Sequence, residues 1–368
     1  DHSPEVPPMP LMAGALAPLF SAPTRSRADF AFGSLGGTYL VLLFLSGEAT
    51  ADVPAQQLLD RNADLFDDRT MMAFTVVRDA EVFARTPEDI PGRRVFHDVA
   101  GEIADRFHLR REDGGTVGYW TVIDPMMRVI DRARLGEGQA LFDRLRCLPP
   151  PEDHAGTPLG APVLVVPRVF EPSFCRRLIE VYEREGGHQS GVMREVDGMT
   201  VPIIDGFKRR RDTTIEDEAL RAEIRSRLSN RLLPMIRKAL MFEVTHVERY
   251  IVACYDADDG GYFKAHRDNT TRATAHRQFA CSINLNAEEF EGGDLRFPEF
   301  GPQTYRPPTG GAVIFSCALL HEATPVMRGR RYAYLPFFYD TAHAKIRAEN
   351  ARFLKTEAES AEPTATAA

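Results

Sequence analysis

The first third of the chain alternates short apolar runs with a helical stretch. Uninterrupted apolar runs cover residues 39–45, 72–77 and 119–124, and each has the length of a strand. Such runs are typical of parallel strands that are buried on both faces. Residues 54–66 carry leucines at helical spacing and predict a helix that opens at Pro54. We therefore expect an α/β domain over residues 12–147.

Residues 148–160 separate two patterns of hydrophobic positions. Proline, glycine and acidic residues dominate this stretch and apolar residues are few, which is typical of a domain boundary. The length of 368 residues also favours two domains over one. We predict a linker over residues 148–160, a second domain over 161–345 and a disordered tail over 356–368.

The second domain begins with predicted helices and continues as a series of short strands. A strand over 163–166 precedes a helix over 174–185, for which Ser173 is a candidate N-cap. Residues 216–240 carry apolar positions spaced by four and predict a long amphipathic helix, which Pro234 should kink or end early. Further strands are predicted over residues 246–255, 279–285, 291–297, 312–315 and 331–338, before a last helix over 341–354. Many short strands with Gly and Pro turns indicate a jelly roll, a double-stranded β-helix, with bracing helices.

Candidate chemistry is concentrated in this second domain. His266 and Asp268 lie two residues apart in a strand-like stretch, so their side chains are expected on one face. His321 follows another buried strand and offers a third ligand. Two histidines and one carboxylate match the facial triad of non-haem Fe(II) oxygenases, which leaves open metal positions.

Residues 161–340 resemble the prolyl 4-hydroxylase-like branch of the Fe(II)/2-oxoglutarate oxygenases. Five features that carry the resemblance occur in the family's order: Tyr255 before a glycine-containing turn, His266-x-Asp268, Gly292-Gly293-x-Leu295-x-Phe297, His321 with Pro325-Val326, and Gly329-x-Arg331-Tyr332. Two departures affect the co-substrate pocket. The turn between Tyr255 and His266 is longer than usual, and Asn284 stands where the family has a tyrosine.

The resemblance implies a dioxygenase that couples decarboxylation of 2-oxoglutarate to hydroxylation of an unactivated C–H bond. It implies Fe(II) on His266, Asp268 and His321, with ascorbate as a further cofactor candidate. Arg331 would bind the distal carboxylate of 2-oxoglutarate through a bidentate fork, and Tyr255 is a second cofactor-binding candidate. We expect Arg331 to begin a strand beside the one that carries His321. The partners would be 2-oxoglutarate, O2 and an unidentified substrate, such as a peptidyl proline, another side chain or a small molecule.

Residues 12–146 resemble the peroxiredoxin branch of the thioredoxin fold. The resemblance is carried by the end of the first apolar run, the turn Ser46 to Asp52, Val53-Pro54 and the stretch Val122 to Arg128. A thiol peroxidase needs a thiolate at a helix N-terminus. No cysteine occurs from Ser46 to Phe66, and Cys147 lies at the far edge of this half. We therefore expect a redox-inactive domain, which is a candidate surface for homo-oligomer formation.

Composition excludes some classes of function. The net charge of −8 argues against a general nucleic-acid binder. Five scattered cysteines favour free thiols and a cytoplasmic location over a disulfide framework. No apolar run is long enough to span a membrane. The basic run Lys208 to Arg211 is interpreted as a solvated loop, with a lip that steers an acidic substrate as the alternative.

Three hypotheses remain open at this point. The first is an Fe(II)/2-oxoglutarate hydroxylase, and the second is a thiol peroxidase. The third is a non-catalytic module that binds the metal or senses oxygen without turnover. Cys254, Cys281 and Cys317 lie in strand-like runs and are expected to be buried small hydrophobes.

Overall fold

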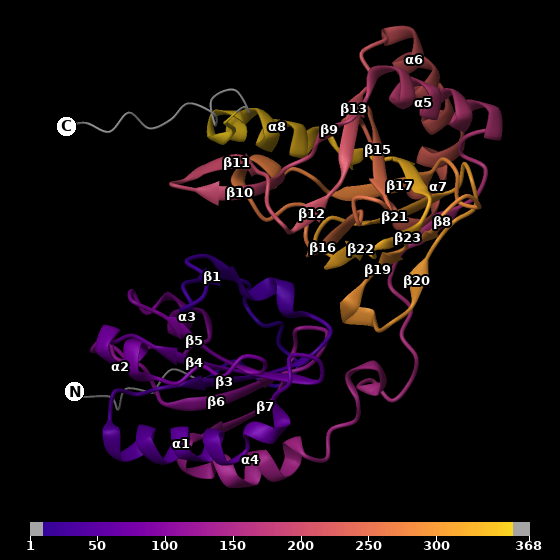
Figure 1. Cartoon of the computed structure of the whole chain (residues 1–368). Coiled ribbons are helices and arrows are strands. Elements are labelled where there is room, and N and C mark those ends of the chain that lie inside the picture. Colours follow the sequence, from indigo (N-terminus) through magenta and orange to yellow (C-terminus); the bar gives the residue numbers. More distant parts are fainter. Residues whose placement is uncertain (1–9, 356–368) are drawn as a thin grey trace. The chain divides into compact units, whose positions relative to one another are not determined.

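The computed structural model describes residues 10–355 and divides into two compact units (Figure 1). The first unit comprises the described residues up to Gly160 together with Pro298–Pro302, and the second comprises the others from Ala161 onward. The tail predicted over residues 356–368 lies outside the described residues. Within residues 10–355, no helix combines the length and the apolar character needed to cross a membrane.

A five-stranded sheet in the order β5-β4-β3-β6-β7 forms the centre of the first unit. Strands β3, β4 and β5 are parallel, whereas β6 runs antiparallel to both of its neighbours, β3 and β7. The prediction of a third parallel strand was therefore wrong in direction. Trp120 and Val122 of β6 pack in the core on one face of the sheet and Ile123 packs in the core on the other, so β6 is buried on both faces although it is antiparallel. An apolar run therefore does not reveal strand direction. The bounds are β3 (Tyr39–Phe44), β4 (Met71–Val77), β5 (Arg93–His97), β6 (Tyr119–Ile123) and β7 (Val129–Arg134).

Helices pack on both faces of this sheet. Val41 and Leu43 of β3 join a core with α1 (Ala49–Arg61) and α4 (Gly138–Leu145), which lie along one face in Figure 1. The alternate residues of β3 face α3 (Glu102–Arg106) and the N-terminal segment across the other face. The short helix α2 (Ala80–Arg85) packs beside β4 and β5. This is the α/β arrangement that the apolar runs predict.

Helix α1 begins earlier than predicted. The N–H groups of Ala51 and Asp52 donate to the carbonyl of Glu48, so the helix is already formed before Pro54. The proline lies inside α1 rather than at its first position. The preference of proline for the first position of a helix therefore placed the predicted start too late.

Two antiparallel sheets form most of the second unit. The larger sheet has nine strands, with β14-β25-β17-β24-β15-β13-β9 in order and with β21 and β8 joined through β17. The smaller sheet has the order β12-β16-β22-β19-β20. The larger sheet contains β8 (Leu164–Val166), β9 (His188–Gln189), β13 (Arg211–Thr214), β14 (His246–Glu248), β15 (Ile251–Asp256), β17 (Phe279–Asn284), β21 (Ala312–Ser316), β24 (Arg330–Tyr334) and β25 (Phe337–Tyr339). The smaller contains β12 (Lys208–Arg209), β16 (Tyr262–His266), β19 (Leu295–Arg296), β20 (Thr304–Tyr305) and β22 (His321–Ala323).

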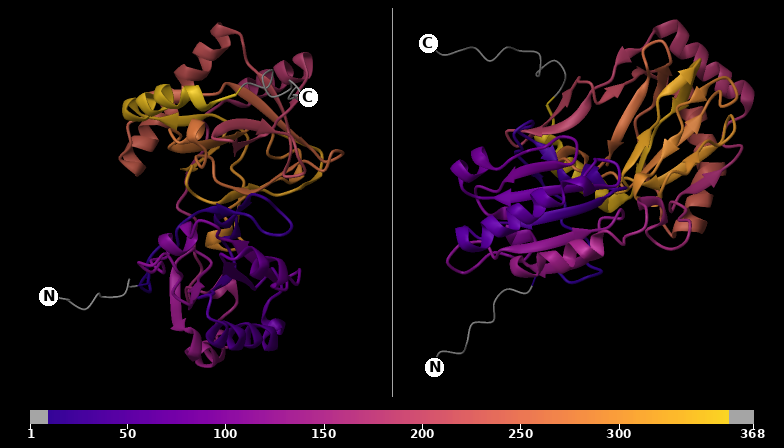
Figure 2. Two further views of the ribbon diagram at one scale, coloured as in Figure 1. Left: turned by 90° about the vertical axis from the view of Figure 1, so that its left-hand side faces the viewer. Right: turned by 60° about the horizontal axis from the view of Figure 1, so that its bottom comes forward.

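Helices cover one face of the larger sheet. Leu178 of α5 (Pro172–Glu185), Ile224 of α6 (Glu218–Arg227) and Ile236 of α7 (Leu233–Leu240) share a core with residues of β15, β17, β21 and β24. The right-hand view of Figure 2 shows the magenta helix α5 beside these orange and yellow strands. Tyr255 and Arg331 alternate with core residues of β15 and β24, so they lie on the opposite face of this sheet.

Two helix predictions need correction. The long helix predicted over 216–240 is interrupted by a π-helical segment, Leu228–Leu232, immediately before Pro234 begins to restrict the chain. Ser173 does not cap α5, because Pro172 is its first residue and Glu171 takes the N-cap position. The last helix, α8, covers Thr341–Asn350 and ends in a short 3-10 turn.

Two further antiparallel strand pairs complete the unit. Strands β10 (Val192–Val196) and β11 (Met199–Ile203) pair with each other, as do β18 (Glu291–Gly292) and β23 (Val326–Arg328). Gly292 has a φ of +72°, and a Cβ there would lie 2.2 Å from the carbonyl oxygen of Pro325. Only glycine fits this close approach of two backbones.

Candidate metal centre

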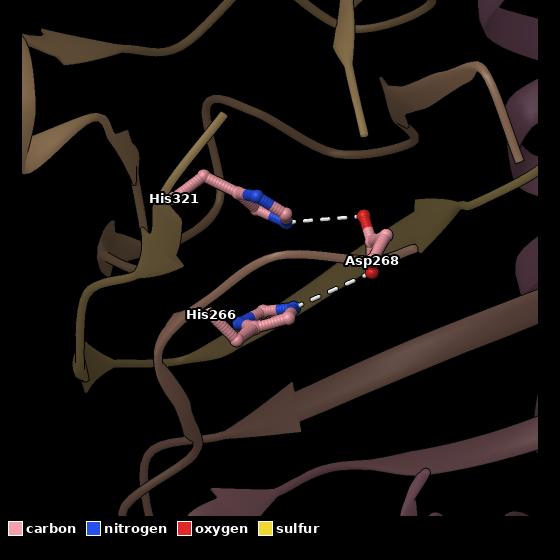
Figure 3. A group of neighbouring side chains, drawn as sticks. All are labelled: His266, Asp268 and His321. Carbon is pink, nitrogen blue, oxygen red and sulfur yellow. Dashed lines mark ion pairs between the residues drawn. The ribbon is translucent and has the colours of Figure 1, made fainter. Parts of the chain in front are cut away.

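His266, Asp268 and His321 converge on one point of the smaller sheet (Figure 3). His266 ends β16 and His321 begins β22, and the two residues are opposite each other in the strand pairing. Nε2 of His266 lies 3.5 Å from Oδ1 of Asp268, and Nε2 of His321 lies 3.3 Å from Oδ2. The candidate ligand atoms all lie within 4.8 Å of one another, so one ion can contact all three.

Asp268 reaches this point from a bend rather than from the strand itself. Strand β16 ends at His266, so the expectation that both residues lie on one extended strand was wrong. The backbone N–H of Asp268 donates to the carbonyl oxygen of Cys317 at 2.9 Å. This bond holds the bend against the end of β21, and thereby fixes the carboxylate opposite the two imidazoles.

A β-bulge in β16 orients His266. Phe263 pairs with Ala323 and His266 pairs with His321, so three steps along β16 match two steps along β22. The Phe263 ring stacks on the imidazole of His266, with centroids 3.5 Å apart. In a regular strand residues three apart face opposite sides, and one extra residue brings both to the same side.

Backbone carbonyls fix the tautomer of both histidines. Nδ1 of His266 lies 2.7 Å from the carbonyl oxygen of Lys264, and Nδ1 of His321 lies 3.0 Å from that of Leu319. A carbonyl oxygen only accepts, so Nδ1 carries the hydrogen in each ring. The lone pair of each Nε2 then points toward the shared position, as metal-ligating histidines require.

The charge states also suit a divalent cation. Burial, followed by the charge of His321, lowers the pKa of His266 to about 4, so its imidazole is neutral at neutral pH. Burial alone would raise the pKa of Asp268. The charges and hydrogen bonds of His321 and His266 outweigh that effect and hold the Asp268 pKa well below its ordinary value. The ligand set therefore carries an ionised carboxylate.

Arg331 is a buried cation without a carboxylate partner among the described residues. Its side chain is on β24 and the residue is 2% exposed. Nη1 donates to the carbonyl oxygen of Gly293 at 2.7 Å and Nη2 to Oγ of Ser282 at 2.9 Å, while Nε has no partner. Burial lowers the Arg331 pKa from its ordinary value, which measures the cost of enclosing this charge. Arg330 is exposed and pairs with Asp256 at 2.7 Å on the other face.

The position of Arg331 differs from the expectation in one respect. Strand β24 lies between β15 and β17 in the larger sheet, whereas β22, which carries His321, belongs to the smaller sheet. The two strands are therefore not neighbours. Our expectation that they lie side by side was wrong. Sequence distance did not reveal that the chain changes sheets between them.

Tyr255 provides a contact between the two sheets. It lies opposite Arg331 in the β15–β24 pairing, with the guanidinium 5.2 Å from its ring centroid. Its ring packs in a cluster with Ala323 of β22 and with Phe263 of β16. Tyr255 therefore joins the guanidinium to the strands that carry the two histidines. The amide of Asn284, in contrast, donates to the carbonyl of Pro307 at 2.9 Å and is buried.

Comparison with known proteins now adds to this geometry. Residues 250–339 match the family model described as the 2OG-Fe(II) oxygenase superfamily. Residues 250–339 form a 2OG-Fe(II) oxygenase domain. The match contains all three candidate ligands, Tyr255 and Arg331, and the family uses Fe(II) and 2-oxoglutarate.

Bacterial hydroxylases are among the relatives of this oxygenase domain. A "PKHD-type hydroxylase" of Synechococcus sp. is 26% identical over 112 residues, which are 28% of this chain and 49% of that protein. One from Pseudomonas putida is 27% identical over 208 residues, which are 54% of this chain and 86% of that protein. The chain thus spans about half the length of the Synechococcus relative.

Two solved structures are similar to parts of the chain. A prolyl-4-hydroxylase from Pseudomonas putida has a TM-score of 0.34 and 20% identity, covering 51% of this chain and 95% of its own. The mitochondrial 2-cys peroxiredoxin of Plasmodium falciparum has a TM-score of 0.32 and 15% identity. The match covers 37% of this chain and 91% of that protein.

Two cations near the oxygenase site were missed from the sequence. Lys208 and Arg210 are 5% and 6% exposed, so the interpretation of the basic run as a solvated loop was wrong for these two residues. Arg209 and Arg211 are exposed, as that interpretation required. The alternation of buried and exposed residues is the period of a strand, and a strand pattern was the signal that could have revealed it. Cys254, Cys281 and Cys317 are buried, as expected.

The turn before α1 in the first unit holds a carboxylate where a thiol peroxidase would need a thiol. Oδ1 of Asp52 accepts from the backbone N–H and the hydroxyl of Ser46, both at 2.9 Å, and Oδ2 accepts from the N–H of Gly47 at 2.8 Å. Val53 is 47% exposed beside it. Cys147 is exposed at the other end of the domain sequence. The side chains from Ser46 to Phe66 include no thiol.

Proposed function

We propose that this protein is an Fe(II)- and 2-oxoglutarate-dependent dioxygenase that hydroxylates an unactivated C–H bond in its substrate. One observation carries the proposal: a histidine–aspartate–histidine cluster lies in the same interior as a buried arginine that lacks a carboxylate partner among residues 10–355. The family match over residues 250–339 and the hydroxylase relatives support it.

The donor set of the cluster fits Fe(II). Two imidazole nitrogens and one carboxylate oxygen are the ligand types of the non-haem iron facial triad, which leaves positions for co-substrate and oxygen. His266, Asp268 and His321 would hold the metal, with Nδ1 of each histidine kept on a backbone carbonyl. Fe(II), when bound with 2-oxoglutarate and O2, supplies an oxidation of C–H bonds that side chains alone cannot perform.

Arg331 would anchor the distal carboxylate of 2-oxoglutarate. Its Nε lacks a partner, and its other two bonds go to neutral oxygens, so the positive charge is uncompensated. A carboxylate would offset the cost of burial through charge-assisted hydrogen bonds. Tyr255 would keep the guanidinium in place from the neighbouring strand, and Ser282 would orient it by accepting from Nη2.

We assign the two units to two domains. Residues 12–147 would form a thioredoxin-like domain of the peroxiredoxin type without redox activity, residues 148–160 a linker, and residues 161–345 a jelly-roll oxygenase domain. The order of parallel and antiparallel strands in the first unit and the two antiparallel sheets of the second support these assignments. The saturated Asp52 carboxylate and exposed Val53 support redox inactivity.

The proposal extends to the partners. The primary substrate would be a peptidyl proline, another side chain or a small molecule, and ascorbate would keep the iron reduced. Homo-oligomer formation through the first domain and a cytoplasmic location complete the proposal. The five free cysteines of the described chain support a reducing compartment.

The test is reconstitution of the metal-free protein. We expect succinate to form from 2-oxoglutarate when Fe(II) and O2 are present, and not when Zn(II) replaces Fe(II). A matching stimulation by peptides or free amino acids would identify the substrate. Stoichiometric Fe(II) binding without succinate formation under any of these conditions would instead indicate a non-catalytic metal-binding module.

A further inference from the structure

A basic cavity of about 510 Å³ lies in the second unit. The basic run Lys208 to Arg211 forms part of its lining, together with Arg330. The three candidate metal ligands do not line it. The cavity is therefore distinct from the positions that the metal and the Arg331 guanidinium occupy.

The carboxylates of the cavity are already paired with cations. Three aspartates contribute to the lining, and a fourth lies behind Arg210. The pairs are Asp205 with Arg194 at 2.8 Å, Asp256 with Arg330 at 2.7 Å, Asp259 with Arg211 at 3.6 Å, and Asp212 with Arg210 at 2.6 Å. Two lining cations, Lys208 and Arg209, have no carboxylate partner among the described residues.

Of the two lining cations without a carboxylate partner, Lys208 is the buried one. Its ammonium donates to Oγ of Ser190 at 2.6 Å and to the carbonyl of Gly191 at 2.9 Å, both neutral groups. Burial, and then the charge of Arg210, lowers the Lys208 pKa well below its ordinary value. Enclosing a charge in this way is costly, and an incoming anion would offset that cost.

Lys208 is also connected to the metal centre. It pairs with Phe263 in the β12–β16 ladder, and its Nζ lies 4.9 Å from the Phe263 ring centroid. That ring stacks on the imidazole of His266. One aromatic ring therefore separates the ammonium from a candidate ligand, so a molecule held in the cavity by Lys208 lies beside the reactive position.

We propose that Lys208 binds a carboxylate of the primary substrate and that the enzyme therefore selects anionic substrates over neutral ones. The inference rests on the proposed function and adds the substrate class to it. The co-substrate does not supply this anion, because its distal carboxylate is assigned to Arg331 and its other carboxylate to the metal. The shared chemistry is a carboxylate, whose source is either an acidic peptide or a free acidic amino acid.

The experiment measures binding, so it does not depend on turnover. Full-length protein is loaded with Mn(II), a redox-inactive stand-in, and 2-oxoglutarate. Equilibrium dialysis then compares a library of short Asp- and Glu-containing peptides with a matched library in which Asn and Gln replace them. A second pair compares free aspartate and glutamate with asparagine and glutamine.

We expect the wild-type protein to retain one acidic probe set roughly tenfold to a hundredfold more tightly than its neutral match. Whether the peptides or the amino acids show this preference identifies the source of the carboxylate. Lys208→Gln keeps a donor for Ser190 and Gly191 and should abolish the preference, as should Lys208→Met. Lys238→Gln removes an exposed lysine of α7 outside the cavity and should leave the preference unchanged.

Two results would overturn the inference. They are equal retention of acidic and neutral probes in both pairs, and an acidic preference that persists in Lys208→Gln. The first measurement needs no variant, so it remains decisive if the substitutions fail to fold and bind no Mn(II). An acidic preference in a protein that forms no succinate would contradict only the proposed function.

Discussion

Two aspartates, one in each unit, show how similar side chains come to have different uses. Asp52 lies in the segment where a thiol peroxidase would carry its thiol. Both of its carboxylate oxygens accept hydrogen bonds from Ser46 and Gly47. The oxygens of Asp268 face two imidazole nitrogens at 3.3 and 3.5 Å instead. A carboxylate saturated by local donors stabilises a turn, whereas one that faces two imidazole nitrogens is available to a cation.

Two arginines repeat the contrast. Arg94 in the first unit makes a bidentate pair with Asp68, at 2.6 and 2.5 Å. Arg331 in the second unit has only neutral acceptors. Charge left uncompensated inside a fold therefore distinguishes the proposed oxygenase site from the first unit, where Arg94 and Asp68 satisfy each other.

The strongest test of the contrast removes a ligand from the second unit. His321→Ala leaves two of three donors, and we expect loss of Fe(II) binding, measured as iron stoichiometry after dialysis. His343→Ala is the matched control, because His343 of α8 pairs with Asp340 at 2.7 Å and lies outside the cluster. Full iron content in His321→Ala would show that the cluster is not the metal site.

The next test removes the uncompensated cation. We expect Arg331→Ala to raise the apparent 2-oxoglutarate constant by roughly thirtyfold to a few thousandfold, since losing a buried charge pair costs about 2–5 kcal/mol. Iron binding should stay near normal, and Arg331→Lys should be milder because it keeps the charge without the fork. The control is the exposed Arg330→Ala. If that change is damaging and Arg331→Ala is silent, the anchor must be reassigned.

A smaller effect is expected from the saturated carboxylate. Asp52→Ala leaves the N–H groups of Ser46 and Gly47 without their acceptor and should lower the free energy of unfolding of the first unit by about 1–3 kcal/mol. Trp120, the chain's single tryptophan, is buried in that unit, so its fluorescence in a urea titration measures the loss. Iron content should not change. The control, Asp29→Ala at an exposed position, should leave the free energy of unfolding almost unchanged. An equal decrease in Asp29→Ala would show that the hydrogen bonds of Asp52 do not stabilise the unit specifically.

No effect at all is expected at the cysteine of the first unit. Cys147 is exposed and distant in sequence from the turn before α1, so we predict no thiol-dependent peroxide consumption. Alkylation of Cys147 should leave iron content and 2-oxoglutarate turnover unchanged. Peroxide turnover that survives iron removal and disappears on alkylation would instead restore the thiol peroxidase hypothesis.

The sequence predicted local features better than relations between strands. Apolar runs located β3, β4 and β6, because burial on both faces leaves a direct mark on composition. They could not give the direction of β6, which depends on the path of the connection. Likewise, the types and order of His266, Asp268 and His321 predicted them as metal ligands. The sheet that carries Arg331 was wrongly assigned, since sheet membership is a property of pairing over long sequence distances.

The buried cations show a second limit. Lys208 and Arg210 are charged residues in a charged run, and composition alone favours exposure. Their burial depends on the pairing of β12 with β16 and on Asp212, Ser190 and Gly191, which no local pattern specifies. Functional charges of this kind become visible only when tertiary partners are known.

The bulge between Phe263 and His266 makes the candidate site depend on a count of residues as well as on their identity. If the same three steps of β16 paired regularly with β22, without the bulge, the imidazole and the ring would turn to opposite faces. Every ligand would still be present in such a chain. A change that lets this short segment pair regularly would thus silence the chemistry while preserving the motif, and a metal site would be lost through a shift of register alone.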